Sequence, residues 1–405
     1  MTTVTTAYDV SAVRACFPAL AEGAAHFDGP GGSQTPAVVA DAVAGTLRSA
    51  IAIEGAVTVA ERRAGGISSA ARQAMADLLG AAPGGIVFGR NMTGLTYDMA
   101  RALVKQWSAG DEIIVTALDH DANIRPWLQA AAPVDVVVRW AEYDPATGSL
   151  PVSAVADLLS PRTRLVAVTG ASNLLGTRPD LPAIAAAVHE AGALLYVDGV
   201  HLTPHAFVDV AELGADFYVC SPYKFLGPHL GVLAAEPSLL ETIHPDKLLP
   251  MPDGVPERFE PGVLPYELLA GTTAAVDFLA DLVPGNGSRR SRLASSLRAM
   301  EEHEIGMRIR LESGLAALDG VTMYGSPDRH RTPTVLFSVA GRDPGSVYES
   351  LGKLAVNVRA GSFYAPECAK RLGLGPAGAV RAGIAPYTNE SDVDRLLAGV
   401  SDLLA

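Results

Sequence analysis

The sequence predicts an α/β fold built on a mainly parallel sheet of seven strands. Between about residues 69 and 235, short apolar runs alternate with longer stretches in which apolar residues recur every three or four positions. This alternation is typical of βαβ units, and the short apolar runs are typical of strands that are buried on both faces. The seven expected strands are Ile86–Phe88, Glu112–Val115, Val134–Val138, Leu165–Val168, Leu194–Val197, Phe217–Val219 and Gly231–Ala234.

The helices expected between these strands should cover both faces of the sheet, and the clearest helical patterns are Ser69–Leu79, Gly94–Val104 and Pro182–Ala191. A breaker cluster, PGNGS at 284–288, precedes a long helical pattern, short strands near Thr334–Ser338 and Val356–Val358, and a closing helix from Ser391. We therefore place a domain change near residue 285. The expected domains are a large one over 21–284 and a smaller α+β domain formed by 1–20 and 285–405.

Composition excludes several classes of protein. Of the 405 residues, 49% are hydrophobic and 19% are charged, which is too apolar for a disordered chain. The net charge of −13 is the wrong sign for binding nucleic acid or an anionic membrane, so we expect neither as a partner. Three widely spaced cysteines without a CxxC pair, and an N-terminus without an apolar leader, predict a cytoplasmic protein with no metal site.

Two charged residues follow neighbouring strands of the predicted sheet. Asp198 ends the apolar run Leu194–Val197, and Lys224 lies in the SPYKFLG segment after the next strand, 26 residues later. One strand-to-strand crossover has about this length, so both side chains should reach the same edge of the sheet, where ligands bind. The alternative is a solvated ion pair on the surface.

Other polar residues follow the same edge. Thr93 precedes a helix expected to open at Gly94, where free amides could hold a phosphate, or it is an ordinary N-cap. Ser221 could add a hydroxyl to the same phosphate. His120 could lie over an aromatic ligand or cap a helix, and Asn173 is ambiguous by itself.

An arginine, Arg381, interrupts the apolar strand pattern at 379–384. A substrate carboxylate held by two hydrogen bonds would satisfy its guanidinium, and a structural salt bridge is the alternative. The nearby run 373–378 matches GxGxxG, but a helical pattern precedes it and a strand follows, which is the reverse of a dinucleotide fingerprint.

An aspartate, a lysine, a phosphate cradle and a stacking histidine at one sheet edge are what pyridoxal 5'-phosphate (PLP) requires. Lys224 would form a Schiff base with the cofactor and later remove the α-proton of the substrate. Asp198 would keep the pyridine nitrogen protonated, because the pair is strong in a low dielectric.

The chain also resembles the class V aminotransferases, in their cysteine desulfurase-like branch. The resemblance implies a fold-type I PLP-dependent transferase that acts on a small-molecule amino acid as a homodimer, with its active sites at the subunit interface. The matching segments are HFDGPGGSQTP at 26–36, RNMTG at 90–94, DHDANIRPW at 119–127, SNLLGT at 172–177, DGVH at 198–201, SPYKFLGP at 221–228, RFEPG at 258–262 and VRAGIAPY at 380–387.

The resemblance implies a role for each matching position. His201 departs from the family, because desulfurases usually carry glutamine there, near the cofactor oxygen. The implied catalytic residues are Lys224, Asp198 and the stacking His120; the other cofactor-binding candidates are Met92, Thr93, Asn173, His201 and Ser221; the implied substrate-binding residues are Arg381 and Asn173. Tyr364, which has no counterpart in the family pattern, is a further substrate-binding candidate.

The largest departure concerns sulfur chemistry. Desulfurases carry a persulfide-forming cysteine after an R-x-G-x-x element, and here that element, at 359–363, is followed by Tyr364. Cys368 lies four residues later in an expected helix, and we interpret it as structural. The glycines of 29–32 and 54–55 could leave room for a large substituent.

These features predict a PLP-dependent C–S lyase that eliminates a thiol from an S-substituted L-cysteine and yields pyruvate and ammonia. It would be similar to enzymes that trim cysteine S-conjugates in secondary metabolism, such as lincosamide biosynthesis. The alternatives at the same site are decarboxylating oxidative deamination, cysteine desulfuration, transamination and epimerisation, because the choice depends on which Cα bond is aligned with the cofactor. A non-enzymatic binding protein and a nucleotide-dependent dehydrogenase are alternatives of other classes.

Overall fold

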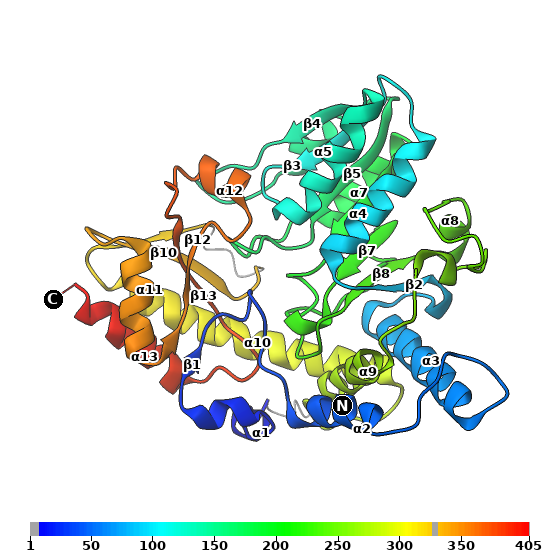
Figure 1. The fold of residues 1–405 in the computed structure, drawn as a ribbon. Coiled ribbons are helices and arrows are strands. Elements are labelled where there is room, and N and C mark those ends of the chain that lie inside the picture. Colours follow the sequence, from blue (N-terminus) through cyan, green and yellow to red (C-terminus); the bar gives the residue numbers. More distant parts are fainter. Residues whose placement is uncertain (1–7, 326–330, 405) are drawn as a thin grey trace, which may run out of the picture.

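The computed structural model describes residues 8–325 and 331–404, and a seven-stranded, mainly parallel sheet forms its centre, as predicted (Figure 1). The spatial order is β2-β8-β7-β6-β5-β3-β4, and β8 alone among these strands runs antiparallel to its neighbours. The bounds are β2 Ile86–Gly89, β3 Glu112–Thr116, β4 Val137–Ala141, β5 Thr163–Thr169, β6 Leu194–Asp198, β7 Phe217–Cys220 and β8 Gly231–Ala235.

Helices cover both faces of this sheet, which explains why most of its strands are continuous apolar runs; the edge strand β4 is partly exposed. In β6, Leu195 and Val197 belong to one hydrophobic core, while Tyr196 between them belongs to the core on the other face. The first core is closed by α3 (Val59–Leu79), α7 (Leu181–Glu190), α9 (Tyr266–Ala280) and α10 (Arg289–Ala316), and the second by α4 (Met92–Leu103) and α5 (Arg125–Ala131).

The C-terminal part contains a second, smaller sheet of four antiparallel strands in the order β12-β13-β10-β9. A short parallel pair, β1 with β11, lies beside it and joins residues from the two ends of the chain. The bounds are β1 Ala25–His26, β9 Val321–Tyr324, β10 Thr334–Val339, β11 Val356–Asn357, β12 Arg359–Gly361 and β13 Ala379–Gly383, with α11 Pro344–Lys353, α12 Pro366–Arg371 and α13 Glu390–Asp402. Short helices complete the chain: α1 Val10–Ala15, α2 Ala37–Leu47, α6 Val152–Ala156 and α8 Pro237–Glu241.

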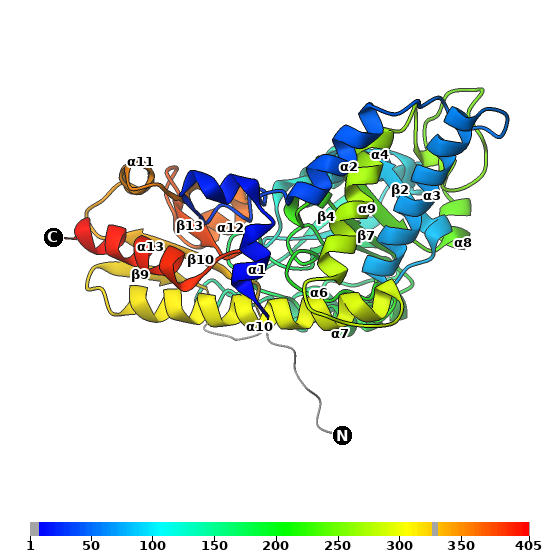
Figure 2. The ribbon, with the colours of Figure 1, turned by 90° about the horizontal axis from the view of Figure 1, so that it is seen from below.

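One helix serves both parts of the molecule. Figure 2 shows α10 running along one side from the large sheet to the small one. Leu293 and Leu297 in its first half pack into the core of the large sheet, whereas Leu311 and Leu315 in its second half pack into the core of the small sheet. The domain change near residue 285 falls just before this helix and stays a prediction.

Three expected boundaries are wrong. The helix before β2 begins at Val59 and not at Ser69, because Thr58 and Glu61 form a capping box at that point. Strand β4, expected from Val134, begins at Val137. Residues 132–134 form a 3-10 turn that ends at Asp135, which is in the left-handed region (φ 54°). The helix after β2 begins at Met92, because the Asn91 side chain accepts a hydrogen bond from the Gly94 amide (2.8 Å) and is the N-cap in place of Thr93.

Two further absences concern the described residues only. None of the helices in 8–325 and 331–404 combines the length and the apolar character needed to cross a bilayer. The same residues contain no group of three His, Cys, Asp or Glu side chains that could hold a metal ion.

Candidate active site

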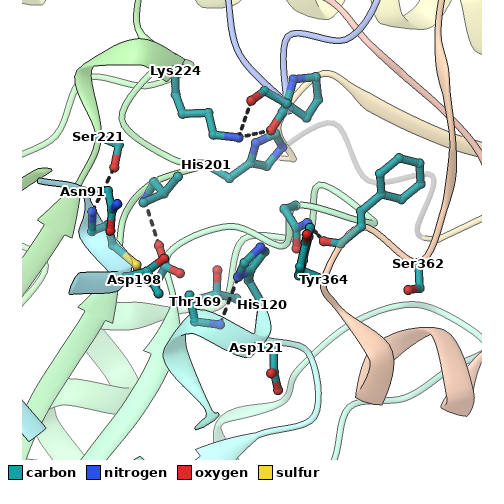
Figure 3. A pocket seen from close by; sticks show the side chains of 18 of the residues that line it. Asn91, His120, Asp121, Thr169, Asp198, His201, Ser221, Lys224, Ser362 and Tyr364 are labelled. Atoms are coloured by element: carbon teal, nitrogen blue, oxygen red, sulfur yellow. Dashed lines mark hydrogen bonds between the residues drawn. The ribbon is translucent and has the colours of Figure 1, made fainter. Parts of the chain in front are cut away.

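A cavity of about 900 Å³ opens at the carboxyl ends of the parallel strands, between the large sheet and the small one (Figure 3). All ten predicted site residues line it, although they come from segments up to about 290 positions apart in the sequence. The structure therefore brings together the whole predicted set, which is Met92, Thr93, His120, Asn173, Asp198, His201, Ser221, Lys224, Tyr364 and Arg381.

Asp198 and Lys224 face this one cavity and do not form a surface ion pair. Asp198 is the last residue of β6, is 4% exposed, and accepts a hydrogen bond from the Val200 amide (3.0 Å). Burial raises the pKa of its carboxyl to about 6. The partly buried Lys224 amine donates to the carbonyl oxygens of Pro30 and Gly31, the second at 3.0 Å.

Burial, together with the nearby Arg381, lowers the pKa of Lys224 to about 7. The amine is therefore poised to gain or lose a proton near neutral pH, which is a property of catalytic lysines. The alternative, a solvated ion pair on the surface, is wrong, because Asp198 is buried and Lys224 donates to backbone oxygens.

The N-terminus of α4 forms a cradle for an anion. The Met92 amide donates to the Ser221 hydroxyl oxygen (3.3 Å), which leaves the Ser221 hydroxyl proton free to donate to a ligand. Thr93, in the first turn of α4, lines the cavity beside them and adds a hydroxyl and an amide at the positive end of the helix. The corrected N-cap, Asn91, also lines the cavity.

His120 caps the short helix that precedes α5, and its ring also faces the cavity. Its Nδ1 accepts a hydrogen bond from the Ala122 amide (3.0 Å), so the neutral ring carries its proton on Nε2. Burial lowers the pKa of His120 to about 4, which keeps the ring uncharged. The two readings of this residue, a cap and a ring over a ligand, are thus compatible.

His201 is held by the small sheet. Its Nε2 forms a hydrogen bond of 2.8 Å with the hydroxyl of Thr334 on β10, and burial lowers its pKa well below the usual value. A neutral imidazole, 3% exposed, therefore joins the loop after β6 to the opposite wall of the cavity.

Arg381 lies across the cavity from the sheet edge and is 3% exposed. Its guanidinium donates to the backbone oxygen of Asn173 (3.0 Å), and the Phe363 ring centroid lies 3.9 Å from its central carbon. Asp28 accepts a longer hydrogen bond from it (3.5 Å), while its buried Nε has no hydrogen-bond partner among the described residues. A half-satisfied, buried guanidinium is suited to receive a carboxylate.

Residues 361–364, which we call the lip, close the cavity opposite the strand ends. Phe363 and Tyr364 both have left-handed backbones (φ 54° and 55°). The Asn173 side-chain amide donates to the Phe363 oxygen (2.9 Å), and the Asp121 amide donates to the Tyr364 oxygen (2.7 Å). The Tyr364 side chain is 79% exposed, and its ring lies 5.7 Å from that of His120.

Sequence reasoning did not single out several residues that line the cavity. Asp28 and Phe363 lie within the segments 26–36 and 359–364 that were already noted, but nothing local in the sequence shows that both reach Arg381. Of the glycine-rich segments, 29–32 contributes Pro30 and Gly31 to the lining of the cavity, whereas 54–55 does not line it.

Comparisons with known proteins agree over nearly the whole chain. A family model described as class-V aminotransferase matches residues 25–396. MT3887, an uncharacterized protein of Mycobacterium tuberculosis, is 37% identical over 407 residues, covering 98% of this chain and 100% of that protein.

Solved structures share the fold of the chain over nearly its whole length. The crystal structure of the cysteine desulfurase CsdA from Escherichia coli aligns with a TM-score of 0.87 at 28% identity, over 98% of both chains. A mutant of C-DES with glycine covalently linked to its PLP cofactor aligns with a TM-score of 0.80 at 22% identity, over 96% of this chain and 99% of that one, and shares the fold.

Proposed function

The chain belongs to the class-V aminotransferase family and is a PLP-dependent enzyme related to the cysteine desulfurases, and we propose that within this family it is a C–S lyase. Its substrate would be an S-substituted L-cysteine, and its products a thiol, pyruvate and ammonia. We place this activity in the trimming of cysteine S-conjugates in secondary metabolism, of the kind found in lincosamide biosynthesis.

The cavity fits PLP. A buried carboxylate, Asp198, is available for the pyridine nitrogen, and the Ser221 hydroxyl and the first turn of α4 are available for the phosphate. Lys224 supplies an amine whose nitrogen bonds only to backbone oxygens among the described residues. We propose that these residues, with Met92, Thr93, His120 and His201, hold the cofactor.

When bound, PLP supplies an electron sink that stabilises negative charge at the substrate Cα. The proposed roles of the protein residues follow from their positions. Lys224 is the attachment point for the cofactor and, once released, its amine takes the Cα proton, which a pKa near 7 permits. Asp198 would keep a proton on the ring nitrogen, and the neutral His120 ring would lie beside the cofactor without competing for that proton.

The substrate side of the cavity has its own proposed residues. Arg381 binds the α-carboxylate, using the unpartnered Nε and one terminal nitrogen, and Asn173 positions the lip and has a buried Oδ1 without a partner among the described residues. Tyr364 faces the departing sulfur. In the elimination, the electron pair of the Cα–H bond forms the Cα=Cβ bond, the C–S pair leaves with the thiolate, and Lys224 would hold the proton taken from Cα. Water then hydrolyses the released enamine to pyruvate and ammonia.

The observation that carries the choice of a lyase is the position of the cysteines. All three cysteines of the sequence, Cys16, Cys220 and Cys368, lie in the described part, and none of them lines the cavity. Cys368 is fully buried in α12, where its thiol donates to the Tyr143 hydroxyl (3.4 Å) and burial raises its pKa to about 12. A sulfur acceptor within the protein is therefore missing from this cavity, and β-elimination requires none.

Product analysis tests the proposal. The PLP-loaded protein is mixed with S-ethyl-L-cysteine, and we expect ethanethiol, pyruvate and ammonia in equal amounts, with Cys368→Ser unchanged. Alanine with sulfide from L-cysteine would instead identify a desulfurase, and an aldehyde with carbon dioxide would identify decarboxylating deamination. A 2-oxo acid with its C–S bond intact, or the D-amino acid, would identify transamination or epimerisation.

We also propose a homodimer. Large apolar side chains are exposed in the proline-rich segment after α8, where Leu248, Leu249 and Val263 are 66%, 96% and 65% exposed. Ile53 and Val57, between α2 and α3, are also exposed, and burying such side chains against a second copy would be favourable. Light scattering of the purified protein at micromolar concentration tests this, and a monomer mass would refute it.

A further inference from the structure

The outer part of the cavity, beyond the residues proposed for PLP and the α-carboxylate, carries two further arginines. Arg125 projects from the first turn of α5, on the side of the large sheet, and Arg359 from the first residue of β12, on the side of the small sheet. In Figure 3, Asp121, which pairs with Arg125, lies beyond His120 as seen from Lys224. Neither arginine has a place in the proposed elimination.

Arg125 is held in a fixed orientation by one carboxylate. Its Nε and one terminal nitrogen donate to the two oxygens of Asp121, at 3.3 and 2.9 Å. The other terminal nitrogen makes no hydrogen bond within the described residues, and the side chain is 39% exposed. A guanidinium clamped on one edge keeps the remaining donors preorganised for a second anion.

The surroundings of Arg125 favour an anion over a cation. Arg359, which is exposed, forms no ion pair with a described residue, and its guanidinium carbon lies 5.7 Å from the ring centroid of Tyr348. Tyr97, on α4, lines the same cavity and adds a hydroxyl donor. The nearby carboxylate of Glu367 pairs with Arg371 (2.7 Å), which also pairs with Glu142.

Four basic side chains, Arg125, Lys224, Arg359 and Arg381, line the cavity against three carboxylates, Asp28, Asp121 and Asp198, on a protein whose net charge is −13. An acidic protein repels anions in general, so a local excess of arginine at a cavity mouth directs them to that point. We propose that the outer cavity is a subsite for an oxyanion at the end of the substrate's S-substituent, most simply a carboxylate, bound by Arg125 with Tyr97 beside it, while Arg359 adds positive charge to the same cavity.

This inference rests on the proposed function for the amino-acid end of the ligand, but its test does not require C–S cleavage. The probes replace the sulfur by a methylene group: L-2-aminoadipate and its 6-amide, and the pair that is one methylene longer, L-2-aminopimelate and its 7-amide. Binding to the PLP-loaded protein is measured by the change in cofactor absorption. Each acid has the shape of its amide, so their difference in Kd isolates the distal charge.

We expect one acid to bind a few-fold to about tenfold more tightly than its amide, as for a partly exposed ion pair. Arg125→Gln should abolish that preference while the Kd of the amide stays unchanged. The matched control is Arg101→Gln, since Arg101 also pairs with a nearby aspartate, Asp98, but lies outside the cavity. Increasing salt should weaken the preference in the unmodified protein.

Equal binding of acid and amide at both lengths would overturn the subsite, and so would a preference that survives in Arg125→Gln. The two proposals fail separately. If S-ethyl-L-cysteine gives no thiol while the acid still binds better than the amide, the lyase proposal falls and the subsite stands. If thiol is released but the distal charge has no effect on binding, the reverse holds.

Discussion

The two walls of the cavity differ in how they are built. The floor, formed by Asp198, Ser221 and Lys224, follows buried strands of the large sheet, and its backbone takes ordinary conformations. The lip, residues 361–364, has φ of +141° at Gly361 and left-handed backbones at Phe363 and Tyr364. It keeps this shape through a few contacts, among them those from Asn173 and Asp121.

This difference teaches where each property of the enzyme resides. Strand ends in a close-packed sheet cannot shift without disturbing the core, so the floor is suited to hold one cofactor in one orientation. A short loop with left-handed residues depends on neighbours for its conformation, so changes there alter what the cavity accepts at little cost to the fold. We therefore expect floor variants to abolish chemistry and lip variants to alter binding and stability.

The largest effect is expected on the floor. In Lys224→Ala, pyruvate formation from S-ethyl-L-cysteine should fall about 10³-fold or more, because both the attachment point and the proton acceptor are lost. Added methylamine should restore part of the rate, since a small amine can replace the missing nitrogen. Full activity in this variant would mean that Lys224 does not carry out the chemistry, and it would contradict the expectation that floor variants abolish turnover.

Arg381 lies between the two walls and should affect binding more than turnover. In Arg381→Lys the charge is kept but the planar fork is lost, and we expect KM for S-ethyl-L-cysteine to rise about 10²-fold with a smaller change in kcat. Steady-state kinetics separate the two parameters. An unchanged KM would mean that the guanidinium serves only its contacts with Asp28, Asn173 and Phe363.

The stability of the cofactor-free protein should depend on pH through the floor. The pKa of Lys224 is lowered to about 7 in the folded chain, so between pH 7 and about 10 the unfolded chain binds more protons and stability rises with pH. Lys224→Met removes this contribution. Its thermal unfolding midpoint should therefore exceed that of the unmodified protein at pH 7, and the gap should narrow toward pH 9; a constant gap would contradict the lowered pKa.

The smallest effect concerns the lip. Tyr364→Gly and Tyr364→Ala both remove an exposed side chain, but only glycine adopts φ near +55° without strain. The glycine variant should be more stable than the alanine variant by about 1 kcal/mol, measured by denaturant unfolding. Equal stability would mean that the lip relaxes to another conformation once the tyrosine is gone.

Much of the fold could be predicted because its signals are local. All seven strands of the large sheet lie near the expected places in the sequence, since burial on both faces gives most of them an apolar run, whereas β4 is largely exposed. The offset of β4 has a local cause as well. It is one of the two edge strands, and the left-handed Asp135 delays its start beyond the valine that opens the apolar run.

The site was predictable where it follows the sheet and less so elsewhere. Asp198 and Lys224 stand immediately after strands, so topology alone places them at one edge. The contacts of Arg381 with Asp28 and Asn173 join residues 353 and 208 positions apart, which no local pattern encodes. The expected N-cap of α4 is Thr93, but the observed one is Asn91. Both residue types cap helices and they stand two positions apart, so only the geometry distinguishes them.

The long helix α10 has a mechanical consequence. Because its two halves are embedded in different hydrophobic cores, α10 opposes a hinge rotation of the small sheet relative to the large one. Such a rotation would have to bend α10 or expose the leucines at one end of the helix to solvent. We therefore expect substrates of different size to be accommodated by movement of residues 361–364 at the cavity opening and not by rotation of the two sheets.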